Sequence, residues 1–252
     1  MAKHVMLNNV THKNLRVKRG YCAEFGNNVH AVAVFPTELG DVQREYPILF
    51  RRDPQTGQYG CVALLGFAPG ENLFLGGGHW NASYVPAIIA RGPFLIGFQE
   101  LDHGGELRRE PVIHVDMDDP RLSEAEGDPV FLPHGGNTPY LDRIARILNA
   151  IQEGMAVTPA MFAAFEEHGL IDAVDLQIDL HTDEQNVLTG FHTINRDKLA
   201  KLPGDVLEKL NGAGFLLGAF LVVASLTNVG KMIDIKNRRT LEGQKAASRA
   251  AT

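Results

Sequence analysis

The residues with the clearest capacity for chemistry lie in a strand-like stretch in the middle of the 252-residue chain. His114 and Asp116 are separated by one residue, so both side chains project from the same face of a strand. A His-x-Asp pair with a distant histidine is the ligand set that holds non-haem Fe(II) and leaves positions open for dioxygen and a co-substrate. His181 and His192 are the candidates for the third ligand. The pattern raises the hypothesis of an Fe(II)-dependent oxygenase.

A structural role explains these residues better. His114 lies in an apolar stretch, where its ring can bond a backbone group, and the polar run after Asp116 is typical of a turn. A His-x-Asp pair also arises by chance in a chain with 10 histidines. We therefore expect no cofactor. Fe(II) is the alternative, with Arg121 or Arg196 holding a co-substrate carboxylate.

A second candidate site is an apolar ligand pocket in the same half of the chain. Its proposed lining residues are Trp80, Tyr84, Phe94, Arg121 and His134. Aromatic side chains fill protein interiors more often than they line ligand sites, so packing in the core is the favoured alternative. The neighbouring glycine run at 76–78 lacks the lysine and the helix start of a phosphate-binding loop.

Composition restricts the class of protein. A hydrophobic content of 44% can bury a sizeable core, and a net charge of −6 gives no reason to expect a nucleic-acid partner. Cys22 and Cys61 are too few for a disulfide scaffold and are expected to be buried thiols in a reducing compartment. The first residues lack the apolar core of a signal peptide, and the apolar run 215–226 is shorter than the roughly 20 residues of a membrane-spanning helix. We expect a cytoplasmic protein without a transmembrane segment.

The elements expected in the first half are short strands. Apolar and β-branched residues predict strands at 30–35, 47–51 and 58–67, and the turn residues at 53–57 join the last two into a hairpin. Two further strands are expected at 93–98 and 112–116, on either side of a polar loop.

The middle of the chain predicts two consecutive helices. Thr138 is a suitable N-cap and Pro139 a suitable first residue, and apolar side chains then recur at helical spacing up to Gly154. Thr158 and Pro159 repeat the same start signal for a second helix that ends at Gly169. This predicts a helical hairpin.

The remaining segment begins with strict alternation. Apolar residues alternate with polar ones over 174–180, and 187–194 is the expected partner strand in an antiparallel sheet with one solvated face. Short helices are expected at 196–202 and 205–210, and a buried strand at 215–224. Ser225 is the expected cap of a C-terminal helix.

The fold class predicted from these elements is α+β: antiparallel sheet with a helical hairpin and a C-terminal helix packed on it. We expect a single domain over 1–240, with a strand-rich half at about 1–122 and a mixed half at about 137–240. The polar stretch 123–137 is the expected seam between them, and 241–252 is expected to be a disordered tail.

Many short segments, in order and along nearly the whole chain, resemble the SapC family of bacterial proteins. They are His4-Val-Met-Leu-Asn-Asn-Val, His12-Lys-Asn-Leu-Arg-Val, Phe35-Pro, Tyr46-Pro-Ile-Leu-Phe, Glu71-Asn-Leu-Phe-Leu, Tyr84-Val-Pro, Arg91-Gly-Pro-Phe-Leu-Ile-Gly-Phe, Asn137-Thr-Pro-Tyr-Leu, Leu188-Thr-Gly-Phe, Ala224-Ser-Leu and Lys236-Asn-Arg-Arg. Each segment alone is unspecific, and their order and number carry the resemblance.

The resemblance implies a role around the bacterial envelope. The family takes its name from loci for surface-layer proteins, and members tend to be encoded beside outer-membrane receptors of TonB-linked uptake. It implies no catalytic residues. We therefore expect a non-enzymatic accessory protein that binds a small molecule or peptide, or a protein partner, in nutrient uptake or envelope systems. An Fe(II)-dependent oxygenase and a surface-layer structural component are the alternatives, and the oligomeric state is left open.

Overall fold

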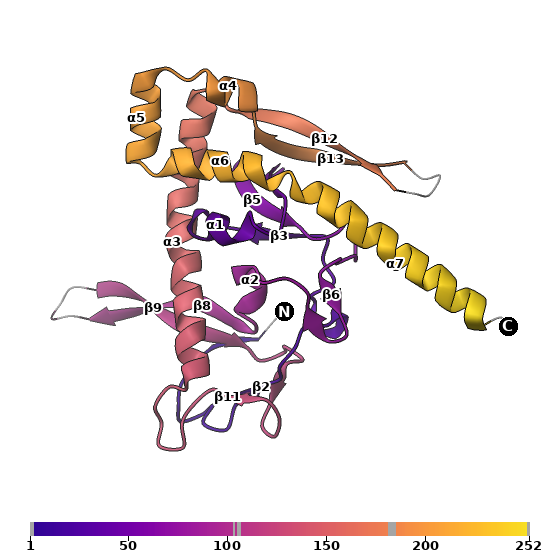
Figure 1. Cartoon of the computed structure of the whole chain (residues 1–252). Coiled ribbons are helices and arrows are strands. Elements are labelled where there is room, and N and C mark those ends of the chain that lie inside the picture. Colours follow the sequence, from indigo (N-terminus) through magenta and orange to yellow (C-terminus); the bar gives the residue numbers. More distant parts are fainter. Residues whose placement is uncertain (1–2, 103, 105–106, 181–184, 251–252) are drawn as a thin grey trace.

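Antiparallel strand pairing organises most of the chain, and helices cover the sheets (Figure 1). The structure is a computed structural model that describes residues 3–102, 104, 107–180 and 185–250. It confirms the α+β class predicted from the sequence. The helices are α1 (Leu39–Val42), α2 (Ala87–Ala90), α3 (Pro139–Glu167), α4 (Arg196–Ala200), α5 (Gly204–Gly212), α6 (Phe215–Ser225) and α7 (Asn228–Ala250), with 3-10 turns at Ala23–Phe25 and Pro36–Glu38.

The largest sheet has five strands and joins both halves of the sequence. Its order is β12 (Ile171–Asp179), β13 (Gln185–Ile194), β4 (Ile48–Arg52), β5 (Tyr59–Leu64) and β3 (Ala31–Val34). The β4–β5 hairpin and the β12–β13 pair confirm two sequence predictions. Only one pair of residues, His192 and Phe50, registers β13 against β4. The β12–β13 hairpin therefore projects as an arm from the edge of the sheet (Figure 1).

Three smaller sheets build the remaining part. One has the order β1 (His4–Met6), β9 (Leu107–Asp116) and β8 (Phe94–Asp102), a second has the order β10 (Leu122–Ser123), β2 (Arg16–Val17) and β11 (Asp128–Pro129), and β6 (Leu75–Gly76) pairs with β7 (His79–Trp80). Strands β8 and β9 pair over their full length, from Phe94 opposite Val115 to Asp102 opposite Leu107. The predicted polar loop 99–110 is therefore largely strand in the described residues.

The prediction of a helical hairpin is wrong, because α3 is one continuous helix with Pro159 inside it. The N-terminal signal is confirmed: the Thr138 hydroxyl accepts a hydrogen bond from the backbone N–H of Leu141 at 3.3 Å. At the second predicted start, Thr158 does not act as an N-cap. Its hydroxyl donates a hydrogen bond to the Gly154 carbonyl, one turn earlier in the same helix, at 2.7 Å. Gly154 lets α3 lie against the turn at Phe35, where a Cβ would lie 2.4 Å from the Phe35 Cβ. The stabilisation from buried side chains along both halves of α3 therefore exceeds the cost of a proline inside the helix.

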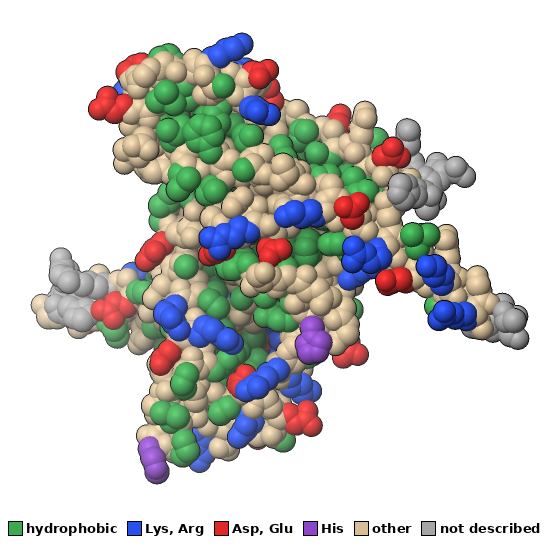
Figure 2. All heavy atoms as spheres, in the orientation of Figure 1, with side chains coloured by type: hydrophobic (Ala, Val, Ile, Leu, Met, Phe, Trp, Pro, Cys, Tyr) green, Lys and Arg blue, Asp and Glu red, His purple; other side chains and the backbone are tan. Residues whose placement is uncertain are grey.

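The segment 215–224 forms helix α6 and not the predicted strand. A continuous apolar run shows no hydrophobic periodicity, so the sequence alone does not distinguish a buried strand from a buried helix. Gly214, with φ of 78°, precedes the helix, and Gly218 faces Leu39 and Met161. The outer face of α6 is apolar too, with Leu217 65% and Phe220 51% exposed. Apolar side chains accordingly gather over this region in Figure 2.

Helix α7 extends through Ala250, where the sequence predicts a disordered tail. Ser225 does not cap it: its hydroxyl accepts a hydrogen bond from the Ile48 backbone N–H at 2.8 Å and so ties α6 to β4. Lys236 forms an ion pair with Glu71 and anchors the middle of α7. By length and composition alone, the helical stretch 215–249 could cross a membrane, although a third of its most apolar window is buried inside the protein.

Two apolar cores underlie this architecture, and neither coincides with a half of the sequence. The larger core combines the five-stranded sheet, the C-terminal half of α3, α6 and the first part of α7. The smaller core combines β2, β8, β9 and the N-terminal half of α3. Because α3 contributes buried residues to both, it links them mechanically, and the predicted seam at 123–137 does not separate two packing units.

Candidate functional site

The proposed iron ligands do not converge in the described residues. His114 and Asp116 lie on β9 of the three-stranded sheet, whereas His192 lies on β13 of the five-stranded sheet. His181 is outside the described residues. Within those residues no three His, Cys, Asp or Glu side chains group as metal ligands would.

The surroundings of His114 and Asp116 match a structural role. The His114 ring packs on Gly97 of the neighbouring strand, where a Cβ would lie 2.3 Å from the ring. The Asp116 carboxylate accepts a hydrogen bond from the Asp118 backbone N–H at 3.1 Å, as in the predicted turn, and lies 3.8 Å from the ring nitrogen of His4.

The five residues of the predicted apolar pocket are dispersed. Phe94 is fully buried in the smaller core, and His134 is exposed in the loop before α3. Trp80 donates a hydrogen bond from its indole N–H to the Tyr46 hydroxyl at 2.7 Å, and the Tyr84 hydroxyl donates to Glu38 at 2.7 Å. Of the five, Arg121 alone lines the basic cleft described next.

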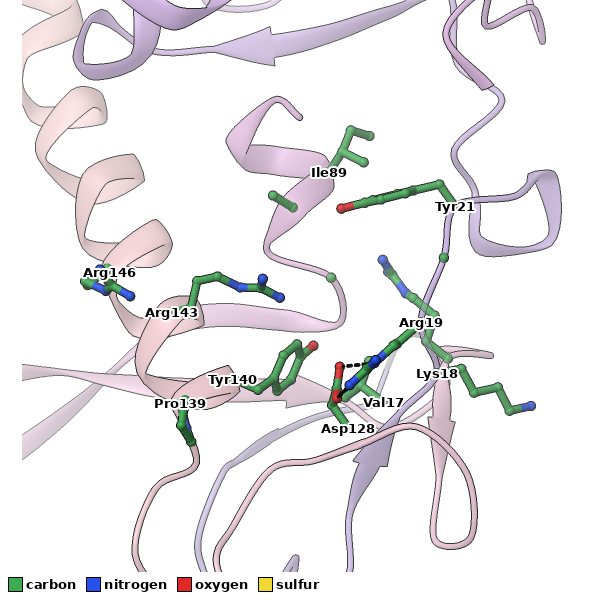
Figure 3. A pocket seen from close by; sticks show the side chains of 14 residues that line it. Val17, Lys18, Arg19, Tyr21, Ile89, Asp128, Pro139, Tyr140, Arg143 and Arg146 are labelled. Atoms are coloured by element: carbon green, nitrogen blue, oxygen red, sulfur yellow. Dashed lines mark hydrogen bonds and ion pairs between the residues drawn. The ribbon is translucent and has the colours of Figure 1, made fainter. Parts of the chain in front are cut away.

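That cleft has a volume of about 540 Å³ and is lined by segments far apart in the sequence. Figure 3 shows it between α2, the N-terminal end of α3 and the chain that follows β2. Its lining residues are Val17, Lys18, Arg19, Gly20, Tyr21, Ile89, Ala90, Gly92, Arg121, Asp128, Pro139, Tyr140, Arg143 and Arg146. Tyr21 and Ile89 belong to the larger core and Val17 and Tyr140 to the smaller one, so the cleft lies between the two cores.

The cleft is strongly basic in a protein whose net charge is −6. Five cationic side chains and one carboxylate line it. Figure 2 shows lysine and arginine side chains over the whole visible face, several of them on the lower half of the molecule. Such a local excess of one charge attracts ligands of the opposite charge.

Two of the cations are held by carboxylates. The Arg121 Nε donates to Asp119 at 2.8 Å, and both side chains are at least 87% buried. The Arg19 Nε lies 3.0 and 2.9 Å from the two oxygens of Asp128, an exposed pair that links β11 to the chain after β2. This pairing holds the pKa of the Asp128 carboxyl below its usual range, mainly through the hydrogen bond from Arg19.

The other three cations, Lys18, Arg143 and Arg146, have no carboxylate partner among the described residues. Arg143 and Arg146 are three residues apart on α3 and so share one face of the helix. The Arg143 guanidinium lies 5.6 Å from the centre of the Tyr140 ring and extends into the cleft (Figure 3). Uncompensated positive charge is thus concentrated at this wall.

Two tyrosines complete the polar lining. Burial raises the pKa of Tyr21, and it raises that of Tyr140 to about 12, while Arg143 and Arg121 act in the opposite direction on both. Both hydroxyls therefore keep their protons near neutral pH and can donate hydrogen bonds to an anion. Gly92 adopts the left-handed conformation that favours glycine, with φ of 60°, and an added Cβ there would lie 3.7 Å from the Arg121 guanidinium and 3.9 Å from the Tyr140 hydroxyl.

Glu38 is a buried carboxylate outside the cleft. It accepts hydrogen bonds from the backbone N–H groups of Phe35 and Ala87 and from the Tyr84 hydroxyl. Burial raises its pKa above the ordinary glutamate value, although these hydrogen bonds partly oppose the rise. The folded state then holds this proton more tightly than the unfolded state, so the contribution of Glu38 to stability is greatest at low pH. It declines as the pH rises through the raised pKa.

We expect the Glu38→Gln variant to lose this pH dependence. The free energy of unfolding of the native protein minus that of the variant should decrease as the pH is raised from 4 to 8, measured by urea denaturation. The exposed Glu166→Gln variant is the control and should show no such trend. If the difference in unfolding free energy between the native protein and the Glu38→Gln variant stays constant with pH, the pKa of Glu38 is not raised in the folded protein.

Sequence reasoning missed most of the cleft. One local feature could have pointed to an anion site. Arg143 and Arg146 lie three residues apart near the start of a predicted helix, where the helix dipole does not stabilise positive charge. Segments that carry the family resemblance contribute Val17, Gly92, Pro139 and Tyr140 to the lining. No single one of these segments indicates an anion site.

Comparison with known proteins agrees with the sequence resemblance. No curated protein and no solved structure matches the chain. The model of the SapC family matches residues 7–232, which includes every element from β2 to α6 and both cores. The protein therefore belongs to the SapC family.

Proposed function

We propose that this protein is a non-catalytic accessory protein that binds a small anionic ligand in the basic cleft. The observation that carries the proposal is the pair of arginines on α3, Arg143 and Arg146, which line the cleft without a carboxylate partner in the described part of the chain. Like charges three residues apart on a helix destabilise it by about 0.2–0.5 kcal/mol, so they are costly without a bound counter-charge. A bound anion would remove this repulsion.

The chemistry of the lining favours binding over catalysis. The only carboxylate in it, Asp128, is held ionised by Arg19, and the two tyrosines keep their protons because burial raises their pKa. The lining thus offers hydrogen-bond donors, and its described residues include no histidine, the side chain that most often transfers protons near neutral pH. We assign a role in nutrient uptake or envelope systems from the SapC resemblance alone.

The proposal predicts saturable binding of anions that depends on the two helix arginines. Sulfate, benzoate and phenyl phosphate are suitable probes, with affinity measured by isothermal titration calorimetry at low ionic strength. A hydrogen bond to a charged group contributes about 1.5–3 kcal/mol, so Arg143→Gln and Arg146→Gln should each weaken binding about tenfold or more. Both side chains are exposed, so the variants should fold normally.

Arg238→Gln is the matched control. Arg238 is also an exposed arginine on a long helix, α7, and does not line the cleft. This variant should bind the probes as the native protein does. If none of the three anions binds, or if binding is unchanged in the double variant Arg143→Gln/Arg146→Gln, the proposal is wrong.

A further inference from the structure

The cleft supplies more positive charge than a monocarboxylate can neutralise. Once Arg121 and Arg19 are assigned to Asp119 and Asp128, the two arginines of α3 still line the cleft without an ion-pair partner among the described residues. A single carboxylate would leave half of this charge uncompensated. The balance of charge favours a group that carries two negative charges.

The arrangement of donors points to the same group. The guanidinium groups of Arg143 and Arg146 and the hydroxyls of Tyr21 and Tyr140 are donors that come from two sides of the cleft. A carboxylate has two oxygens in one plane, whereas a phosphate monoester has three terminal oxygens that accept from several directions. The donors therefore suit a tetrahedral anion better than a planar one.

The remaining wall of the cleft has a different character. Ile89 and Ala90 of α2, with Val17 and Pro139, present apolar surface beside the donors. The volume of about 540 Å³ is within the range of clefts that hold small organic ligands and exceeds that of an inorganic anion. This leaves room for an organic group attached to the anion.

We infer that the ligand of the cleft is a small organic phosphate monoester, bound as its dianion. The inference rests on the proposed function and specifies its ligand class. The phosphate would contact Arg143 and Arg146, and the organic group would lie against the apolar wall of α2.

The pH dependence of binding distinguishes this ligand class. A phosphate monoester has a second pKa of about 6, so roughly a tenth of it is dianionic at pH 5 and nearly all of it at pH 7.5. The charged and titratable groups of the cleft are Lys18, Arg19 and Tyr21 after β2, Arg121 with its partner Asp119, Asp128 on β11, and Tyr140, Arg143 and Arg146 on α3. Helix α2 contributes only apolar residues, and no histidine lines the cleft.

The experiment compares phenyl phosphate, benzoate and sulfate by isothermal titration calorimetry at pH 5 and pH 7.5. Phenyl phosphate and benzoate share the aromatic ring and differ in the anionic group, and sulfate remains a dianion at both pH values. At pH 7.5 we expect phenyl phosphate to bind about tenfold or more tightly than benzoate. Its affinity should fall about tenfold at pH 5, in proportion to the dianion, while that of sulfate stays constant.

The possible failures separate the two proposals. If benzoate binds as tightly as phenyl phosphate, or if the affinity of phenyl phosphate does not change with pH, the phosphate inference is overturned and the anion-binding function stands. If no probe binds, or if the Arg143→Gln/Arg146→Gln variant binds as well as the Arg238→Gln control, both are overturned. Circular dichroism and the unfolding temperature of each variant establish that it is folded.

Discussion

The Phe165→Ala variant is expected to lower the free energy of unfolding by about 3–5 kcal/mol, the usual cost of removing a buried phenylalanine. Phe165 is fully buried, and its ring stacks on Phe50 of β4 and meets Phe162 edge-on, with ring centres 6.3 and 6.2 Å apart. The contact with Phe50 joins α3 to the five-stranded sheet. Alanine would leave a cavity between rigid elements, which can collapse only partly. Urea denaturation measures the effect.

Phe220→Ala is the matched control for this prediction. Phe220 also lies on a helix, α6, but its side chain is 51% exposed. Its replacement should cost less than about 1 kcal/mol, because surface substitutions away from packed features have small effects. Equal losses in the two variants would mean that α3 does not pack on the sheet as described.

The Gly127→Ala variant is expected to lower the free energy of unfolding by about 2–4 kcal/mol and to distort the cleft. Gly127 has φ of 101°, and a Cβ there would lie 2.1 Å from the Val17 carbonyl oxygen. The left-handed conformation costs a non-glycine residue about 1–2 kcal/mol, and each strand hydrogen bond that is lost adds about 0.5–1.5 kcal/mol. Asp128 follows directly and holds Arg19, so separation of β11 from β2 would also move a wall of the cleft.

The steric part of this effect is isolated by Gly70→Ala. Gly70 also has a positive φ, 76°, but has no atom within 4 Å of the position of an added Cβ. It should cost only the left-handed strain, about 1–2 kcal/mol, and leave the affinity for sulfate unchanged. If Gly127→Ala is no more destabilising than Gly70→Ala and binds sulfate as tightly as the native protein, the close contact of β11 with β2 is wrong.

The position of the cleft between two cores gives these stability predictions a functional consequence. Helix α3 contributes Phe165 to the larger core and Leu148 to the smaller one, and Arg143 and Arg146 project from the same helix. Any variant that shifts α3 should therefore also change anion binding. Variants such as Phe220→Ala, which leave α3 in place, should not.

Local sequence patterns predict secondary structure correctly where the pattern lies within a single segment. The alternation over 174–180 predicted β12 correctly, because a sheet with one solvated face imposes a period of two on the residues themselves. Thr138 and Pro139 predicted the start of α3, because an N-cap acts on the backbone groups of the next turn. The order of short SapC-like segments likewise predicted the family.

Local signals gave the wrong secondary structure where contacts with residues far away in the sequence determine it. Thr158 and Pro159 resemble a helix start, but Phe162 and Phe165 beyond them bury against β4 and keep α3 continuous. The stretch 215–224 has the composition of a buried strand, and only its packing on α1, α5 and the sheet shows it to be a helix. Residues 241–250 are helical although their own polar sequence favours a frayed end.

Patterns within short segments specify the α+β class, most of the antiparallel strands and the family of this protein. The location of the basic cleft, in contrast, depends on contacts between distant segments. Its residues come from segments around 17–21, 89–92, 121–128 and 139–146. No local pattern relates these segments, because their approach depends on the burial of two cores connected by α3.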